Sequence, residues 1–145
     1  MSGWSEQIFR YCERGMSASL LAEPLNAASN LAFVIVALFA AVRLTRAMYR
    51  ASVSSTDFAA ITLMIALTTA IGLGSFVFHS FATRWSQLGD VVPIALFVIA
   101  YCAFAMRVML KLSDTTALTA TLLFAGCMAV AGAICQPSGA SLAAA

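Results

Sequence analysis

The stretch FAAITLMIALTTAIGLGSFVFHSF, residues Phe58–Phe81, decides the fold class, because its 24 residues contain no aspartate, glutamate, lysine or arginine. A helix that spans a membrane needs about 20 mainly apolar residues. Three other stretches have the same character, namely Pro24–Val42, Val91–Met109 and Ala117–Ile134. The sequence therefore predicts an all-α membrane protein with four transmembrane helices and no sheet.

The composition agrees with this class. Hydrophobic residues make up 62% of the chain and charged residues 10%, whereas soluble domains carry roughly a quarter charged residues. The net charge of +2 and the lack of a basic run with interleaved aromatic residues argue against a nucleic-acid partner. None of the four cysteines has the short spacing of a zinc or redox motif, so we expect them to act as small apolar residues; they are Cys12, Cys102, Cys127 and Cys135.

Polar links separate the four stretches. The first link, Arg43–Asp57, offers Ser55 or Thr56 as a cap for the helix that follows. Ala82–Asp90 is predicted to be a short link, with Asp90 as a candidate N-cap, and Lys111–Thr116 joins the last two helices. Five of the eight basic residues fall in or beside the first and third links, so the positive-inside rule places those links in the cytoplasm and the amino terminus outside. We expect a bacterial inner membrane.

Polar residues inside the apolar stretches follow helical spacing. Glu23, Asn26 and Asn30 share one face of the first helix, where the two asparagines are also the kind of residue that bonds to neighbouring helices. Thr68, Gly72, Ser75 and His79 form a small and polar stripe on the second helix, which must face protein or water instead of lipid. Gly72 and Gly74 are also typical of close helix packing.

The path of the chain through the bilayer gathers these residues near one membrane face. The first helix begins there, the second ends there and the third begins there, which brings together seven polar residues: Glu13, Glu23, Asn26, Asn30, Ser75, His79 and Asp90. Because polar residues in a membrane are costly, such a cluster indicates a functional site.

His79 is the only histidine of the chain and a natural metal ligand. A zinc-bound hydroxide, a carboxylate at Asp90 that moves the proton, and an oxyanion donor at Ser75 would together form a hydrolytic site. A Ser-His-Asp nucleophilic triad is the alternative, although no nucleophile elbow is present. A catalytic zinc needs about three protein ligands, and beyond His79 and Asp90 no third is evident in the sequence.

Two segments resemble the signatures of the alkaline ceramidases and their bacterial relatives. These are YCERGMSASLLAEPLNAASNLAF, Tyr11–Phe33, and GLGSFVFHSFATRWSQLGD, Gly72–Asp90. The resemblance implies a seven-helix zinc hydrolase that cleaves the amide of ceramide, a lipid of sphingolipid metabolism. It assigns His79 to the zinc, and Ser75 and Asp90 to positions near the metal.

The family's other two zinc ligands form a His-x-x-x-His pair on a seventh helix, and this sequence has no such pair. We therefore expect residues 1–145 to form a single incomplete ceramidase-like domain, equivalent to the first four helices and inactive by itself. The alternative is a non-catalytic bundle or a receptor-like protein that has lost the metal site.

The resemblance also implies a calcium site near the amino terminus. Glu13 and Glu23 match its two glutamates. Arg10 stands where the family has an aspartate, and Gly15 stands where it has an asparagine, so the calcium site is incompletely matched.

Overall fold

The computed structural model describes residues 3–8, 13–20, 22–50 and 53–134. Across these ranges it contains five helices, no strand and one isolated antiparallel bridge between Gln7 and Thr83. The chain divides into two units, residues 1–100 and residues 101–145. Four helical stretches are long and apolar enough to cross a membrane, which confirms the predicted all-α membrane class.

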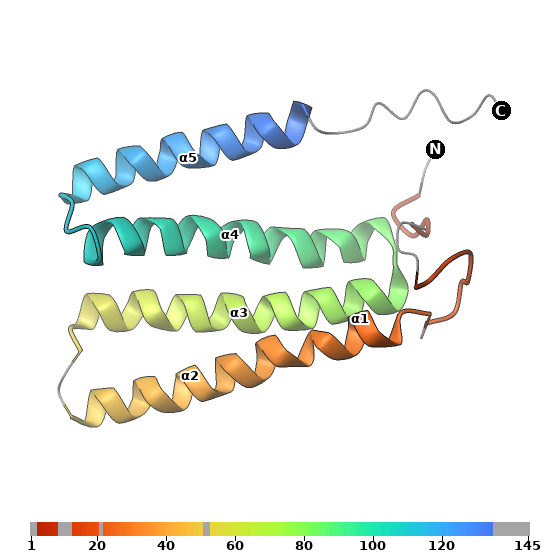
Figure 1. The fold of residues 1–145 in the computed structure, drawn as a ribbon, viewed down its shortest axis with the longest axis horizontal. Helices are drawn as coiled ribbons and strands as arrows, with labels where there is room; N and C mark the ends of the chain where they lie inside the picture. The colour runs from red at the N-terminus through yellow and green to blue at the C-terminus, as the bar shows by residue number, and fades with distance from the viewer. Residues whose placement is uncertain (1–2, 9–12, 21, 51–52, 135–145) are drawn as a thin grey trace. The chain divides into compact units, whose positions relative to one another are not determined.

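The first span consists of two helices, α1 (Pro24–Ser29) and α2 (Leu31–Tyr49), which follow one another in Figure 1. They meet at Asn30, whose carbonyl accepts the amide of Phe33 at 3.2 Å. Helix α2 continues seven residues beyond the predicted end at Val42. The guanidinium of Arg43 lies 4.9 Å from the centre of the Phe39 ring, so a basic residue at this end packs its charge over the apolar surface.

The second span, α3 (Ser55–Phe81), ends where the sequence predicted. Its cap is Ser54, whose hydroxyl accepts the amide of Asp57 at 3.1 Å. The predicted caps Ser55 and Thr56 were wrong, because both lie inside the first turn.

Helix α4 (Arg84–Val108) begins seven residues before the predicted Val91. The polar segment Ala82–Asp90 is therefore mostly helix, and the interpretation of Asp90 as an N-cap was wrong. The hydroxyl of Ser86 accepts the amide of Thr83 at 3.0 Å, as the third helical residue does in a capping box, and donates to the Thr83 carbonyl at 3.0 Å. The Ser86 hydroxyl thus gives a partner to the Thr83 amide, a backbone group that the start of a helix leaves unpaired.

Two glycines of α3, Gly72 and Gly74, lie where neighbouring helices approach closely. A Cβ atom added to Gly74 would overlap the carbonyl of Gly89, whose carbon would lie 2.7 Å away. Pro93 removes the amide that would normally bond to that carbonyl within α4. A Cβ at Gly72 would meet α2, with the Cβ of Phe33 at 3.1 Å. Both glycines therefore serve helix packing, as predicted, but toward different neighbours.

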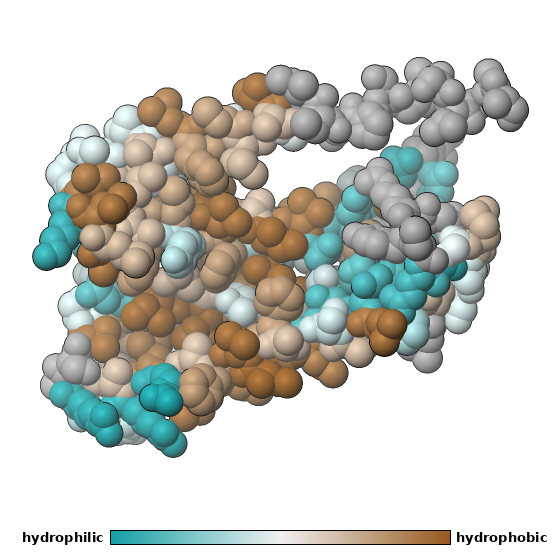
Figure 2. Space-filling view, in the orientation of Figure 1, coloured by the Kyte–Doolittle hydropathy of each residue, from teal (hydrophilic) through white to brown (hydrophobic). Residues whose placement is uncertain are grey.

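The second unit contains the end of α4 and α5 (Asp114–Ile134). The hydroxyl of Ser113 accepts the amide of Thr116 at 3.3 Å, and Arg107 pairs with Asp114 at 3.0 Å. Figure 2 shows hydrophobic residues along the helices, and many large apolar side chains are exposed. Such a surface suits lipid instead of water.

Candidate functional site

The start of the first span and the end of α3 are joined by a buried carboxylate. Oε2 of Glu23 lies 2.6 Å from Nδ1 of His79, and Oε1 of Glu23 lies 2.6 Å from Nε of Arg14. The side chains of Glu23 and Arg14 are fully buried, and that of His79 is 11% exposed. Arg14 and His79, which lie 9 and 56 positions from Glu23 in the sequence, thus both contact its carboxyl group.

Glu23 lies just before the first span, where its ionisation is set by opposing effects. Burial alone raises the pKa of the carboxyl, but hydrogen bonds from Arg14, His79 and Asn26 outweigh it and bring the pKa below its ordinary value of 4.5. Glu23 is therefore ionised at neutral pH and can only accept hydrogen bonds. Nδ1 of His79 must therefore carry a proton and donate a hydrogen bond to the Glu23 carboxylate.

The asparagines of the first span support this carboxylate locally. Nδ2 of Asn26 donates to Oε2 of Glu23 at 3.3 Å, and Nδ2 of Asn30 donates to the carbonyl of Asn26 at 2.8 Å. The shared face was predicted correctly, since Glu23 and Asn30 are both buried. The hydrogen bonds that the structure shows for the amides of both asparagines lie within their own segment.

Glu13 performs the capping that Glu23 does not. Its two carboxylate oxygens accept the amides of Leu25 at 2.7 Å and Asn26 at 3.2 Å. These are free amides at the start of α1, where a negative charge is also favourable. Glu23 occupies the N-cap position but makes no capping bond with its side chain.

Ser75 and Asp90 lie on the two helices that meet at the glycine contact. A Cβ on Gly74, the neighbour of Ser75, would lie 3.4 Å from the backbone nitrogen of Asp90. Ser75 is buried on α3. Oδ1 of Asp90 is also buried and has no hydrogen-bond partner among the described residues. An unsatisfied buried carboxylate oxygen is costly, and such groups concentrate at functional sites.

The amino-terminal segment packs against the turn between α3 and α4. The amide of Ile8 donates to the carbonyl of Ala82 at 2.6 Å, and the amide of Arg84 donates to the carbonyl of Glu6 at 3.3 Å. Ala82 itself has a left-handed backbone with φ of 48°, which costs energy for a residue with a side chain. The segment thus covers the end of the bundle at which the cluster lies.

The described residues do not form a complete metal site. No group of three His, Cys, Asp or Glu side chains within them is placed to hold a metal ion. The acid that contacts His79 is Glu23, which the sequence analysis had assigned to calcium, so the alternative triad of Ser75, His79 and Asp90 is not the arrangement observed. Cys102 and Cys127 are free thiols, while Arg10, Cys12 and Cys135 lie outside the described residues.

Sequence reasoning missed Arg14, which it counted only as a loop charge. The available signal was a basic residue between two signature positions, Glu13 and Gly15, ten residues before the first apolar stretch. Its burial could not be read from the sequence, because its partners lie 9 and 65 residues away.

Comparison with known families places these residues in context. Residues 7–140 match the ceramidase family, a range that includes both spans joined by Glu23 and His79 and all of the predicted site residues. No curated protein and no solved structure gave a match. Because the family match covers most of its length, the chain belongs to the ceramidase family.

Proposed function

We propose that the chain is the part of a ceramidase-type hydrolase that binds a lipid amide, such as ceramide, and positions it for hydrolysis within the membrane. The observation that carries this proposal is the unpartnered buried Oδ1 of Asp90. The backbone of Asp90 lies close to α3 at Gly74, the neighbour of Ser75, and the chain belongs to the ceramidase family. A polar group left without a partner inside an apolar bundle is a reason to expect a polar substrate there.

We assign roles to three side chains. Asp90 takes a proton from the attacking water and passes it to the leaving amine. Ser75 donates a hydrogen bond to the oxyanion that forms on the amide carbonyl. His79 is held in one orientation by Glu23, as a carboxylate bonded to the other ring nitrogen holds metal-binding histidines.

Zinc dependence is part of the proposal but rests on ligands beyond these side chains. His79 supplies one nitrogen, and the described residues offer no group of three ligands. The remaining ligands must come from beyond the described residues or from a second chain. The 145 residues alone are therefore expected to have no appreciable ceramide hydrolase activity, and no catalytic step is assigned to a metal here.

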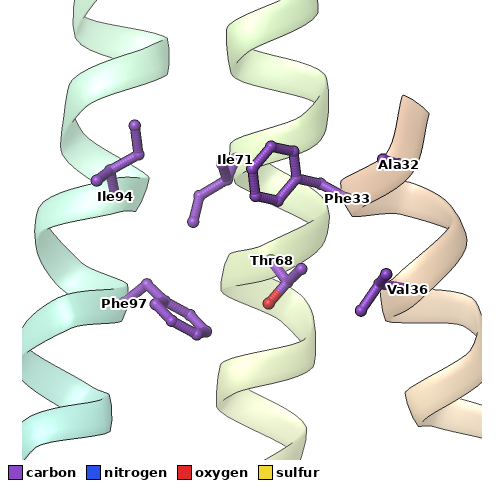
Figure 3. A pocket seen from close by; sticks show the side chains of 7 residues that line it. All are labelled: Ala32, Phe33, Val36, Thr68, Ile71, Ile94 and Phe97. Carbon is purple, nitrogen blue, oxygen red and sulfur yellow. The ribbon is translucent and has the colours of Figure 1, made fainter. Parts of the chain in front are cut away.

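An apolar cavity in the first unit is suited to a hydrocarbon chain. It has a volume of about 520 Å³, and Figure 3 shows that its lining comes from α2, α3 and α4. The hydroxyl of Thr68 donates to the carbonyl of Met64 within α3, so its proton is not offered to a ligand. Thr68 lies eleven residues before His79, about 16 Å along the helix. We assign the cavity to an acyl chain whose amide lies near His79. The lining residues are Ala32, Phe33, Val36, Thr68, Ile71, Ile94 and Phe97.

A non-catalytic or receptor-like bundle is the second candidate, and the lack of a three-ligand group among the described residues favours it. Metal analysis of the detergent-purified protein separates the two. Stoichiometric zinc that is lost in His79→Ala would exclude the non-catalytic reading.

The function is tested by supplying helices from a full-length relative, with release of fatty acid from a labelled ceramide in micelles as the readout. We expect zinc-dependent turnover that His79→Ala and Asp90→Asn reduce. Ser75→Ala should cost roughly 10²-fold, the usual effect of one oxyanion donor. Turnover that is unaffected by all three changes would refute the assigned roles.

The location is proposed as a bacterial inner membrane, with the amino terminus outside. The basic residues of the first and third links support this orientation.

A further inference from the structure

The guanidinium of Arg14 is fully buried, and each of its three nitrogens donates hydrogen bonds. An arginine side chain has five N–H groups, and Arg14 makes five hydrogen bonds. The acceptors are one carboxylate oxygen and four backbone carbonyls: Oε1 of Glu23 at 2.6 Å, and the carbonyls of Ser17 at 3.3 Å, Ser19 at 3.0 Å, His79 at 2.7 Å and Ser80 at 3.2 Å.

These acceptors form a cation site. A carboxylate and several backbone carbonyls are the oxygen ligands that a hard divalent cation such as calcium prefers. In this chain a guanidinium already lies among them, and the side chains of Arg14 and Glu23 are both 0% exposed. The other glutamate expected to bind calcium, Glu13, accepts the backbone amides of α1 with both of its oxygens. The residues present therefore do not fit the calcium site that the family resemblance implies.

We propose that Arg14 is a built-in cation that takes the place of calcium in this chain. Its guanidinium fastens three parts of the first unit to one another, namely the loop of residues 13–20, the start of the first span and the end of α3. The amino-terminal segment is thus held against the bundle without a bound divalent cation. This inference does not depend on the catalytic roles proposed above.

The position of the charge explains why arginine suits the task. The carbonyls of His79 and Ser80 belong to the last turn of α3, where they lack partners within the helix and carry the negative end of its dipole. A planar guanidinium reaches these carbonyls, the loop carbonyls and the Glu23 carboxylate at the same time. An ammonium has only three N–H groups, so a lysine at this position would leave acceptors unpaired.

The first test uses the unmodified protein in detergent. Its thermal unfolding is followed by circular dichroism in calcium chloride and, separately, in EGTA, and calcium binding is measured by isothermal titration. We expect the same midpoint in both solutions and no stoichiometric binding. A midpoint that rises with calcium, or one calcium bound per chain, would overturn the proposal.

The second test compares Arg14→Gln with Arg84→Gln, which serves as the matched control. Arg84 also pairs with a glutamate, Glu6, but both side chains are about half exposed. We expect Arg14→Gln to lower the midpoint by on the order of 10 °C, because it leaves a carboxylate buried without its cation. Arg84→Gln should have little effect, as expected for a surface pair. Equal midpoints for the two variants would contradict the proposal.

If Arg14→Gln does not yield folded protein, Arg14→Lys tests whether the guanidinium is the resident cation. This variant keeps the positive charge but cannot make five hydrogen bonds. A midpoint below that of the unmodified protein, again without a response to calcium, supports the guanidinium as the resident cation. An unchanged midpoint, or stabilisation of the variant by calcium, refutes it.

Discussion

Nδ1 of His79 lies 2.6 Å from Oε2 of Glu23, and this contact joins the end of α3 to the start of the first span. It gives the only histidine of the chain a defined orientation in an otherwise apolar bundle. Because Glu23 is ionised and can only accept, the contact also decides which ring nitrogen carries a proton.

The protonation of His79 is the first prediction. In protein labelled with ¹⁵N-histidine, the single imidazole should show a protonated Nδ1 in nuclear magnetic resonance spectra. Glu23→Gln should weaken this preference, because a glutamine amide can donate as well as accept. Glu6→Gln, in an exposed pair, is the control and should leave the spectrum unchanged. A neutral ring protonated only at Nε2 in the unmodified protein would show that the assigned bond is wrong.

The pH dependence of stability follows from Glu23. Its pKa is lower in the folded protein than its ordinary value of 4.5, so the unfolded chain binds the proton more readily. The stabilisation is therefore fully present above about pH 4.5 and is lost as the pH falls through the folded pKa. The difference in melting temperature between the unmodified protein and Glu23→Gln should shrink on acidification. A difference that grows below pH 4.5 would contradict the lowered pKa.

The contact between α3 and α4 predicts that two similar substitutions differ in their effect on stability. Gly74→Ala places a methyl group against the carbonyl of Gly89 and should destabilise the bundle by about 3 kcal/mol, since a backbone cannot yield as a side chain does. Gly89→Ala is the control, because its Cβ would meet nothing within 4 Å. Unfolding in mixed detergent micelles measures both variants. Similar losses in the two would mean that the helices do not cross at Gly74.

We expect the buried carboxylate of Asp90 to lower the stability of the folded protein. Its Oδ1 is buried without a partner in the part of the chain that the structure describes. Asp90→Asn removes the charge at nearly constant volume, and we expect it to stabilise the protein by about 1 kcal/mol. Loss of stability in the thermal midpoint would indicate that the carboxylate has a structural partner instead.

The membrane topology predicts labelling of single cysteines from opposite sides. Met16 precedes the first span and Tyr49 ends it, and the two side chains are 84% and 92% exposed. In a cysteine-free background, Met16→Cys should react with an impermeant reagent from one side only, and Tyr49→Cys from the other. Ser86, in the turn region between α3 and α4, is fully buried and unsuitable as a label site. Reaction of both cysteines from the same side would rule out the first span.

The number of spans was predictable from the sequence because each is a long run without charged residues, and burial of such a run in lipid depends on local composition. The end of α3 at Phe81 was predicted for the same reason. The start of α4 was not, since Arg84–Gly89 is polar and its helix depends on the hydroxyl of Ser86 and on packing of the amino-terminal segment. Hydropathy carries no information on such contacts.

For the site, the sequence by itself determined which polar residues lie near one membrane face: helical spacing and alternating crossings place Glu23, Ser75 and His79 there. Only the tertiary structure decided the pairing. Glu23 binds Arg14 and His79, while Asp90 keeps a buried oxygen without a described partner. The reason is physical. Periodicity sets the face of a helix from neighbouring residues, whereas the partner of a buried charge depends on how segments 9 and 56 residues apart meet in space.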